Sequence, residues 1–278
     1  MYSHFSSTGW MTPFGLMFIA AILTAWFLAR RNAAARGVDP SHVDLVLPLT
    51  VIVGVIGGVA VASLMPSDYL LAGEAMNHGL RIRLFGMLGT GALGVFVYSR
   101  LAGLSFRQLL DIFALPTLAG LAIHRIGCHF AGCCWGDIVR GPDAGALATQ
   151  VQTTSLLQGI VDGIRYPAGS LPYEQHVALG LIEPGAVASL PVYPVQLFEV
   201  AGLLILILLL SRVARRDVAS GTLAVLTIVG YAAMRFLIGY WRADGSIVLG
   251  NLTITQLQCL VLVSSILLLP RLRRSVVS

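Results

Sequence analysis

The sequence predicts an all-α polytopic membrane protein. Three observations support this class: 56% of the 278 residues are hydrophobic, only 11% are charged, and the mean hydropathy is +0.83. An ordinary soluble domain carries roughly 25% charged residues, so a soluble core does not account for so few charges.

Seven apolar stretches approach the length of about 20 residues that a helix needs to cross a bilayer. They cover residues 12–30, 44–65, 84–101, 108–126, 194–211, 220–241 and 253–270. The polar start of the chain lacks the positive charge of a cleavable signal peptide, so the first stretch is expected to be a retained span. The fourth stretch contains Asp111 and Pro116 and is the span most open to a break or partial insertion.

The arginines predict the orientation, because short cytoplasmic loops collect positive charge. There is no lysine, and with the N-terminus outside and the C-terminus cytoplasmic, eleven of the 18 arginines fall on inside segments. The remaining arginines are Arg81, Arg83, Arg125, Arg140, Arg165, Arg235 and Arg242. Their charge near a bilayer is costly, which makes them candidates for function.

The chain divides into three parts on this reading. Residues 1–135 hold helices one to four, residues 136–192 form a small periplasmic head of loops and short elements, and residues 193–278 hold helices five to seven. The expected location is the bacterial inner membrane. Nucleic acid is not expected as a partner, because the arginines lie in small clusters between apolar runs.

The segment 231–242 carries two arginines, Arg235 and Arg242, seven residues apart and therefore expected on one helical face. Guanidinium groups bind phosphate oxygens two at a time, so the pair is suited to a lipid headgroup. The alternative is that Arg242 extends to the membrane interface and Arg235 only neutralises Glu199.

The segment 193–199 places Gln196 and Glu199 on one side of a helix that begins near Pro194. Glu199 either forms a buried ion pair with Arg235 or Arg125, or orients a reacting group.

The segment 125–136 combines Arg125 with three glycines and three cysteines, Cys128, Cys133 and Cys134. Thiolates and the nearby His129 could bind zinc or copper, or the cysteines could pack as small apolar side chains. The two separated Cys-x-x-Cys pairs of structural zinc sites are missing, so no metal and no cofactor are expected.

These three segments resemble the bacterial prolipoprotein diacylglyceryl transferase family from roughly residue 80 onward. The family signature Arg-x-Gly-Asn-Phe-x-Asn-Gly-Glu-x-x-Gly matches at Arg125, Gly127, Gly132 and Gly136. The family's Pro-Ser-Gln-Leu-Tyr-Glu is similar to residues 194–199, its arginine-bearing sixth span is similar to 231–242, and Asp111 has a family counterpart.

The resemblance implies seven spans with an outward head and the transfer of diacylglyceryl from phosphatidylglycerol to the thiol of a prolipoprotein cysteine or another acceptor. The catalytic residues it implies here are Arg125, Arg235 and Glu199, and His129 is expected to join them in place of the family's base. The substrate-binding residues it implies are Gly127, Cys128, Gly132, Cys133, Gly136, Gln196, Arg242 and Asp111.

The sequence also departs from the family. Phe85 stands where the family has a histidine, Cys128 and Cys133 replace an asparagine and a glutamate, and Gly239 replaces another glutamate. His129, His124 or His78 is expected to substitute as the base. Two alternatives remain: a cysteine-based membrane thiol oxidoreductase or metal-handling protein, and a non-catalytic relative that binds lipid.

Overall fold

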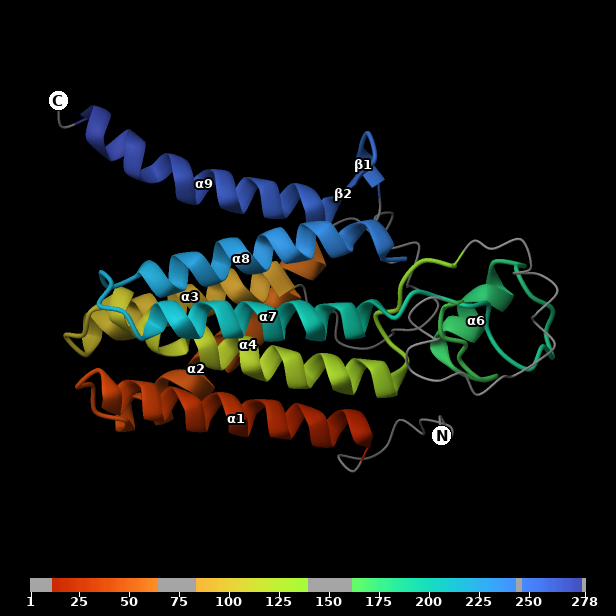
Figure 1. Ribbon diagram of the computed structural model, residues 1–278, viewed down its shortest axis with the longest axis horizontal. Helices are drawn as coiled ribbons and strands as arrows, with labels where there is room; N and C mark the ends of the chain where they lie inside the picture. Colours follow the sequence, from red (N-terminus) through yellow and green to blue (C-terminus); the bar gives the residue numbers. More distant parts are fainter. Residues whose placement is uncertain (1–11, 65–83, 140–161, 244–246, 277–278) are drawn as a thin grey trace.

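The computed structural model describes residues 12–64, 84–139, 162–243 and 247–276, and shows long helices lying side by side with a lobe at one end (Figure 1). Of the predicted functional residues, His78, Arg81, Arg83 and Arg140 lie outside the described ranges. The helices are α1 (Pro13–Ala35), α2 (Ser41–Leu64), α3 (Leu84–Leu101), α4 (Phe106–Ala131), α6 (Leu171–Ala178), α7 (Val195–Ala214), α8 (Thr222–Ile238), the 3₁₀ turn η4 (Gly239–Trp241) and α9 (Ile254–Val276). A short antiparallel pair, β1 (Ile247–Leu249) and β2 (Leu252–Thr253), precedes α9.

Each predicted span coincides with one of the long helices, so the all-α class is confirmed. Within the described ranges, five helices are long and apolar enough to cross a membrane: α1, α2, α4, α7, and α8 together with η4. The break considered for the fourth span is absent, because α4 continues through Pro116 for 26 residues. Neighbouring helices surround a buried proline and help to satisfy the backbone around it.

Local signals in the sequence set the helix starts. The Thr12 hydroxyl accepts a hydrogen bond from Gly15 N at 3.0 Å, and Pro13 occupies the first turn of α1. Ser105 caps α4 in the same way by accepting from Gln108 N at 3.5 Å. Such caps satisfy amides that have no partner inside the helix.

Helix α4 lies at the centre of the packing. It contacts α1 on one side and α7 and α8 on another, while α2 and α3 pair with each other. The core between α4, α7 and α8 is built from side chains such as Leu118, Leu203 and Leu223. This arrangement brings the C-terminal end of α4, the start of α7 and the end of α8 together (Figure 1).

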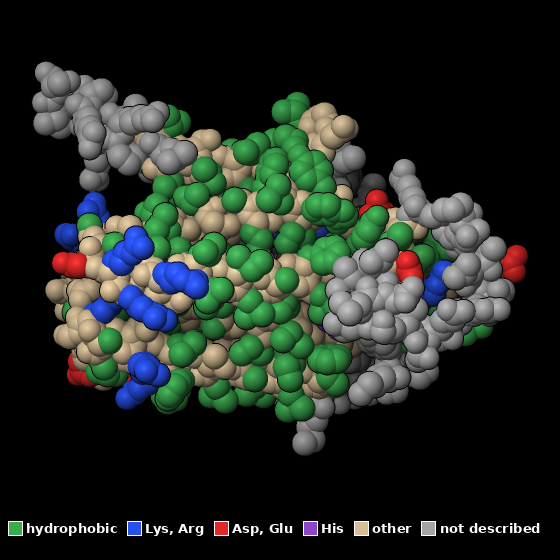
Figure 2. All heavy atoms as spheres, in the orientation of Figure 1, with side chains coloured by type: hydrophobic (Ala, Val, Ile, Leu, Met, Phe, Trp, Pro, Cys, Tyr) green, Lys and Arg blue, Asp and Glu red, His purple; other side chains and the backbone are tan. Residues whose placement is uncertain are grey.

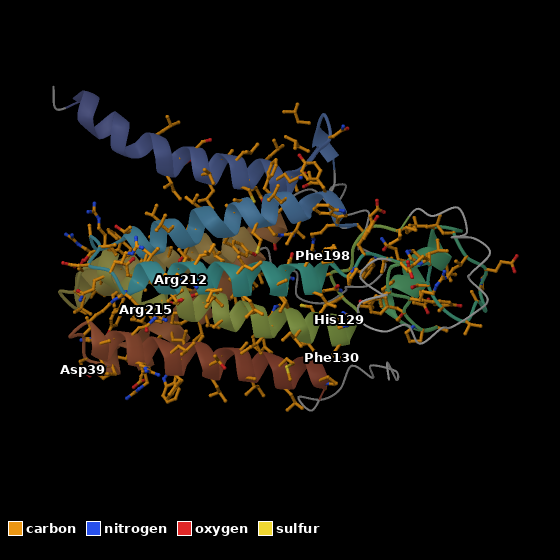
Figure 3. The ribbon with its side chains drawn as sticks, in the orientation of Figure 1. Asp39, His129, Phe130, Phe198, Arg212 and Arg215 are labelled. Atoms are coloured by element: carbon orange, nitrogen blue, oxygen red, sulfur yellow. The ribbon has the colours of Figure 1, made fainter. Side chains whose placement is uncertain are left out.

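The surface supports a membrane environment for the helices. Hydrophobic side chains cover their sides, whereas arginines gather at the end opposite the lobe (Figure 2). Arg212 of α7 and Arg215, which follows the last residue of α7, lie at this basic end (Figure 3). Large exposed apolar surface of this kind is unusual for a protein in water.

The described part of residues 136–192 forms the lobe beyond the ends of α4 and α7 (Figure 1). It contains α6 and isolated antiparallel bridges such as Ile164 with Val192, around a small core of Trp135, Tyr166 and Val192. The boundaries of the three predicted parts remain a prediction.

Candidate active site

Three arginines from different parts of the chain converge on one buried carboxylate. Glu199 of α7 is 1% exposed, and its Oε2 forms an ion pair with Arg125 Nε of α4. Its Oε1 lies 3.3 Å from Arg235 NH1 of α8 and 3.1 Å from Arg242 NH1. Three guanidinium groups thus meet one carboxylate in this cluster, named here the arginine cluster. Buried guanidinium groups are suited to binding an anion such as phosphate.

The predicted convergence of Arg125, Glu199 and Arg235 is therefore confirmed as a structural fact. Arg242 joins them for a different reason from the one predicted. Helix α8 ends at Ile238, so Arg242 does not share a helical face with Arg235; it follows η4 in an extended conformation with φ −94° and ψ 137°.

The glycine Gly136 allows the chain after α4 to pass between the segments that carry Glu199 and Arg242. Gly136 N donates to Tyr193 O at 3.0 Å, and Gly136 forms an antiparallel bridge with Arg242. A Cβ atom at Gly136 would lie 2.6 Å from the carbonyl oxygens of both Trp241 and Tyr193. Glycine is thus required here by close backbone approach.

The other two signature glycines also lie in packed surroundings. A Cβ at Gly127 would lie 2.9 Å from Met17 Cβ of α1, and Gly132 ends α4 in the left-handed conformation with φ 63°. These observations give the glycines packing roles, and their contact with a substrate remains a prediction.

Gln196 ties the start of α7 to the turn after α4. Its side chain is fully buried, and Nε2 donates to Cys133 O at 2.7 Å and to Tyr166 OH at 3.4 Å. Gln196 Oε1 has no hydrogen-bond partner among the described residues, so it is able to accept a hydrogen bond from a bound molecule.

Helix α8 adds two polar side chains that sequence reasoning missed. Thr227 and Tyr231 precede Arg235 at intervals of four residues, and all three are buried. Neither hydroxyl has a hydrogen-bond partner within the part of the chain that the structure describes. The four-residue spacing was a usable signal, because it puts three polar groups on one face of a helix that is otherwise apolar.

Gln256 is a second residue that the sequence did not single out. A Cβ at Gly239 would lie 2.9 Å from Gln256 Cγ, so this glutamine side chain fills the space beside Gly239. Its Nε2 donates to Phe236 O at 3.1 Å, and its Oε1 accepts from Thr253 N at 2.9 Å.

The two histidines of α4 have different surroundings. His129 lies one turn after Arg125, is 8% exposed, and its Nδ1 has no hydrogen-bond partner among the described residues. Figure 3 shows it at the end of α4 beside Phe130. His124 instead contacts the rings of Phe14 and Phe18, with ring centroids 5.5 and 6.1 Å away. His129 lies one helical turn beyond Arg125, whereas His124 directly precedes Arg125 in the sequence.

The three cysteines Cys128, Cys133 and Cys134 come together at the end of α4, where their Sγ atoms all lie within 4.8 Å of one another. The pKa of the Cys134 thiol lies well below its usual range, because hydrogen bonds with the Cys128 and Cys133 side chains stabilise the thiolate. The pKa of Cys133 is raised by its hydrogen bonds with the same neighbours.

Asp111 is not part of this site. It lies near the start of α4, about four turns from Arg125, where Oδ2 accepts from Gly221 N at 2.7 Å and Oδ1 from Ala224 N at 2.8 Å. These amides begin α8, so Asp111 caps that helix. The arginine cluster lies at the opposite end of α4, and the substrate contact of Asp111 stays a prediction.

Comparisons with known proteins identify the family of the chain. Residues 8–270 match the family model of prolipoprotein diacylglyceryl transferase. A phosphatidylglycerol–prolipoprotein diacylglyceryl transferase of Dehalococcoides mccartyi is 28% identical over 244 residues, which cover 85% of this chain and 80% of that protein. The transferase 2 of Clostridium perfringens is 25% identical over 259 residues, covering 92% and 88%, and that of Geobacter sulfurreducens is 26% identical over 245, covering 82% and 76%. The chain therefore belongs to the prolipoprotein diacylglyceryl transferase family.

Proposed function

We propose that this chain transfers the diacylglyceryl group of phosphatidylglycerol to a thiol acceptor such as a prolipoprotein cysteine. The observation that carries the proposal is the arginine cluster, in which three buried guanidinium groups converge on one carboxylate. Family membership supplies the reaction, and the cluster supplies a place where its phosphate can bind.

The charge of the arginine cluster suits the course of this reaction. The acceptor sulfur forms a bond to the glyceryl carbon as the bond between that carbon and the phosphate oxygen breaks. The bonding electrons leave with glycerol phosphate, whose charge grows from −1 as a diester to −2 as a monoester. Buried guanidinium groups that bind the growing charge more tightly than the initial charge lower the barrier.

The three arginines of the cluster share one role in the proposed reaction. Arg125, Arg235 and Arg242 bind phosphate oxygens, and Glu199 holds the three guanidinium groups in place while the phosphate is absent. The hydroxyls of Thr227 and Tyr231 extend the polar face of α8 beyond the cluster and are suited to the glyceryl ester oxygens.

The thiol proton needs an acceptor, and His129 takes this role in the proposal. It is buried one turn beyond Arg125 and has an Nδ1 atom with no hydrogen-bond partner among the described residues. Phe85, which the resemblance aligns with the family histidine, lies in the first turn of α3 and offers no titratable group.

The proposed orientation places the active site on the periplasmic side of the bacterial inner membrane, with seven spans, the N-terminus outside and the C-terminus cytoplasmic. The arginines gathered at the end opposite the lobe support this orientation, because cytoplasmic segments collect positive charge (Figure 2). Phosphatidylglycerol then enters from the bilayer and the acceptor approaches from the lobe.

The experiment is transfer of labelled diacylglyceryl from phosphatidylglycerol vesicles to a peptide bearing a lipobox cysteine. Wild-type protein in detergent is expected to add one diacylglyceryl group to the peptide cysteine, detected by mass spectrometry. His129→Gln is expected to lower kcat by about 10²–10⁴-fold, the usual contribution of a general base. Bound lipid with no transfer, while the Dehalococcoides mccartyi relative is active in parallel, would instead establish a lipid-binding protein.

A further inference from the structure

The three thiols at the end of α4 form a compact set of ligand atoms to which the transfer mechanism proposed above gives no role, and the substrate contacts that the resemblance implies for Cys128 and Cys133 remain predictions. Cys128, Cys133 and Cys134 place their Sγ atoms within 4.8 Å of one another. In a tetrahedral zinc site with Zn–S bonds of about 2.3 Å, sulfur atoms lie about 3.8 Å apart. A contraction of about 1 Å or less would therefore bring all three sulfurs into the positions of zinc ligands.

The local backbone brings the three side chains together. Gly132 ends α4 in the left-handed conformation, and Cys133 N then donates to Cys128 O at 3.1 Å. Cys134 has φ 59°, and within the described ranges it is the sole residue other than glycine with a positive φ. A non-glycine residue rarely adopts this conformation without a compensating contact, and here it keeps the Cys134 thiol beside the other two.

A fourth donor lies one helical turn earlier. His124 Nδ1 is 3.7 Å from Cys128 Sγ, and the four-residue spacing places both side chains on the same face of α4. Three thiolates and one imidazole are a common ligand set of structural zinc, which is almost always four-coordinate.

We propose that Cys128, Cys133, Cys134 and His124 bind one zinc ion, which fixes the turn between α4 and the lobe. The three sulfurs bind as thiolates, the thiol protons that they still carry leave to solvent, and no oxidation or reduction takes place. Zinc with three thiolates and a neutral imidazole carries a net charge of −1.

The position of this turn gives the zinc a structural purpose. Cys133 O accepts the hydrogen bond from Gln196, and Gly136, two residues after Cys134, forms the bridge with Arg242. A metal bound by Cys128 and Cys134 therefore fixes the segment between Arg125 and Gly136, and Gly136 forms the backbone bridge with Arg242. The zinc is a positioning device on this account, and it does not touch the substrate.

A disulfide is the competing use of the same thiols. Adjacent cysteines do not easily bridge each other, so a disulfide would join Cys128 to Cys133 or to Cys134 and leave one thiol free. The fourth cysteine of the chain, Cys259, is buried in α9 and lies outside the cluster. It provides a matched control for every cysteine substitution.

The test uses the full chain in detergent, purified under reducing conditions without chelators and then supplied with Zn²⁺. Elemental analysis is expected to give about one zinc per chain, and Co²⁺ in its place is expected to show the sulfur-to-cobalt charge-transfer bands of a thiolate site. Cys128→Ser, Cys133→Ser and Cys134→Ser are each expected to weaken zinc binding by at least tenfold in a chelator competition, whereas Cys259→Ser leaves it unchanged. His124→Gln is expected to weaken binding while keeping the charge-transfer bands.

The cobalt spectrum of the wild-type chain keeps the proposal testable even where a variant fails to fold. Absence of zinc and of charge-transfer bands in the reduced, folded chain overturns the proposal. Zinc bound equally well by the three cluster variants also overturns it, as does a Cys128 disulfide that persists under the reducing conditions. Zinc content is measured without lipid or acceptor, so this result is independent of whether transfer occurs.

Discussion

Arg242 NH1 lies 3.1 Å from Glu199 Oε1, although Arg242 belongs to an extended segment that follows the end of α8. The bridge between Gly136 and Arg242 fixes that segment against the chain that leaves α4. Three separate backbone contexts, a helix interior, a helix end and a bridged loop, thus supply the three guanidinium groups. The central claim that follows is that these groups bind the phosphate of the lipid donor.

Replacing Glu199 with glutamine is expected to destabilise the protein and to reduce transfer. The variant removes the carboxylate that pairs with all three buried guanidinium groups and leaves those groups together. Breaking a buried ion pair on one side typically costs about 3–5 kcal/mol. Thermal unfolding in detergent measures the loss of stability, and added phosphatidylglycerol is expected to restore part of it. An unchanged Tm without lipid would contradict the pairing.

Gly136→Ala is expected to lower activity because its Cβ would lie 2.6 Å from the carbonyl oxygens of Trp241 and Tyr193. The backbone must then shift and carry Arg242 away from Glu199, at a cost of about 1–3 kcal/mol. Gly89→Ala is the matched control, since a Cβ there would meet nothing within 4 Å. Equal transfer rates and equal Tm values for the two variants would show that the close approach is unimportant.

Asp111→Ala is expected to reduce stability. Asp111 accepts hydrogen bonds from Gly221 N and Ala224 N at the start of α8, and losing such a cap costs about 0.5–2 kcal/mol. The measurements are Tm and the transfer rate per folded molecule. We expect a lower Tm and an unchanged transfer rate per folded molecule. A large loss of transfer rate with an unchanged Tm would show that Asp111 acts in the transfer reaction and contradict a purely structural role.

The lobe is expected to loosen at acidic pH because of His176. Burial lowers the pKa of His176, which is 3% exposed, and its Nδ1 accepts from Leu190 N at 3.2 Å. The folded lobe therefore favours the neutral ring, and its stability is full above the unfolded pKa of about 6.5 and falls as the pH drops below that value. Hydrogen exchange of α6 at pH 7.5 and pH 5.5 measures this change. His176→Gln is expected to remove most of the pH dependence. If the wild-type exchange rate, after correction for the intrinsic effect of pH, is the same at both pH values, His176 does not have this role.

The sequence predicted much of the fold because a run of about 20 apolar residues is a local signal for a membrane-spanning helix. The seven apolar stretches lie close to the observed bounds of the long helices. The convergence of Arg125, Glu199 and Arg235 was also predictable, because buried charges in a membrane protein must find one another.

The remaining features depend on contacts between distant parts of the chain. The role of Asp111 requires the start of α8, which lies 110 residues later in the sequence. The left-handed conformation of Cys134 depends on the packing of the turn after α4 and has no signal in the residue type. The reach of Arg242 depends on the bridge with Gly136, whereas helical spacing alone gave the wrong geometry.

The central claim is tested most directly by the rate of diacylglyceryl transfer from phosphatidylglycerol to a lipobox peptide in Arg235→Lys protein. Lysine keeps the positive charge but loses the two-point contact with phosphate oxygens, so kcat is expected to fall by about 10²–10³-fold. Arg215→Gln, at the exposed basic end of α7, is the control and is expected to transfer at the wild-type rate. A wild-type rate in folded Arg235→Lys protein would contradict phosphate binding by the arginine cluster.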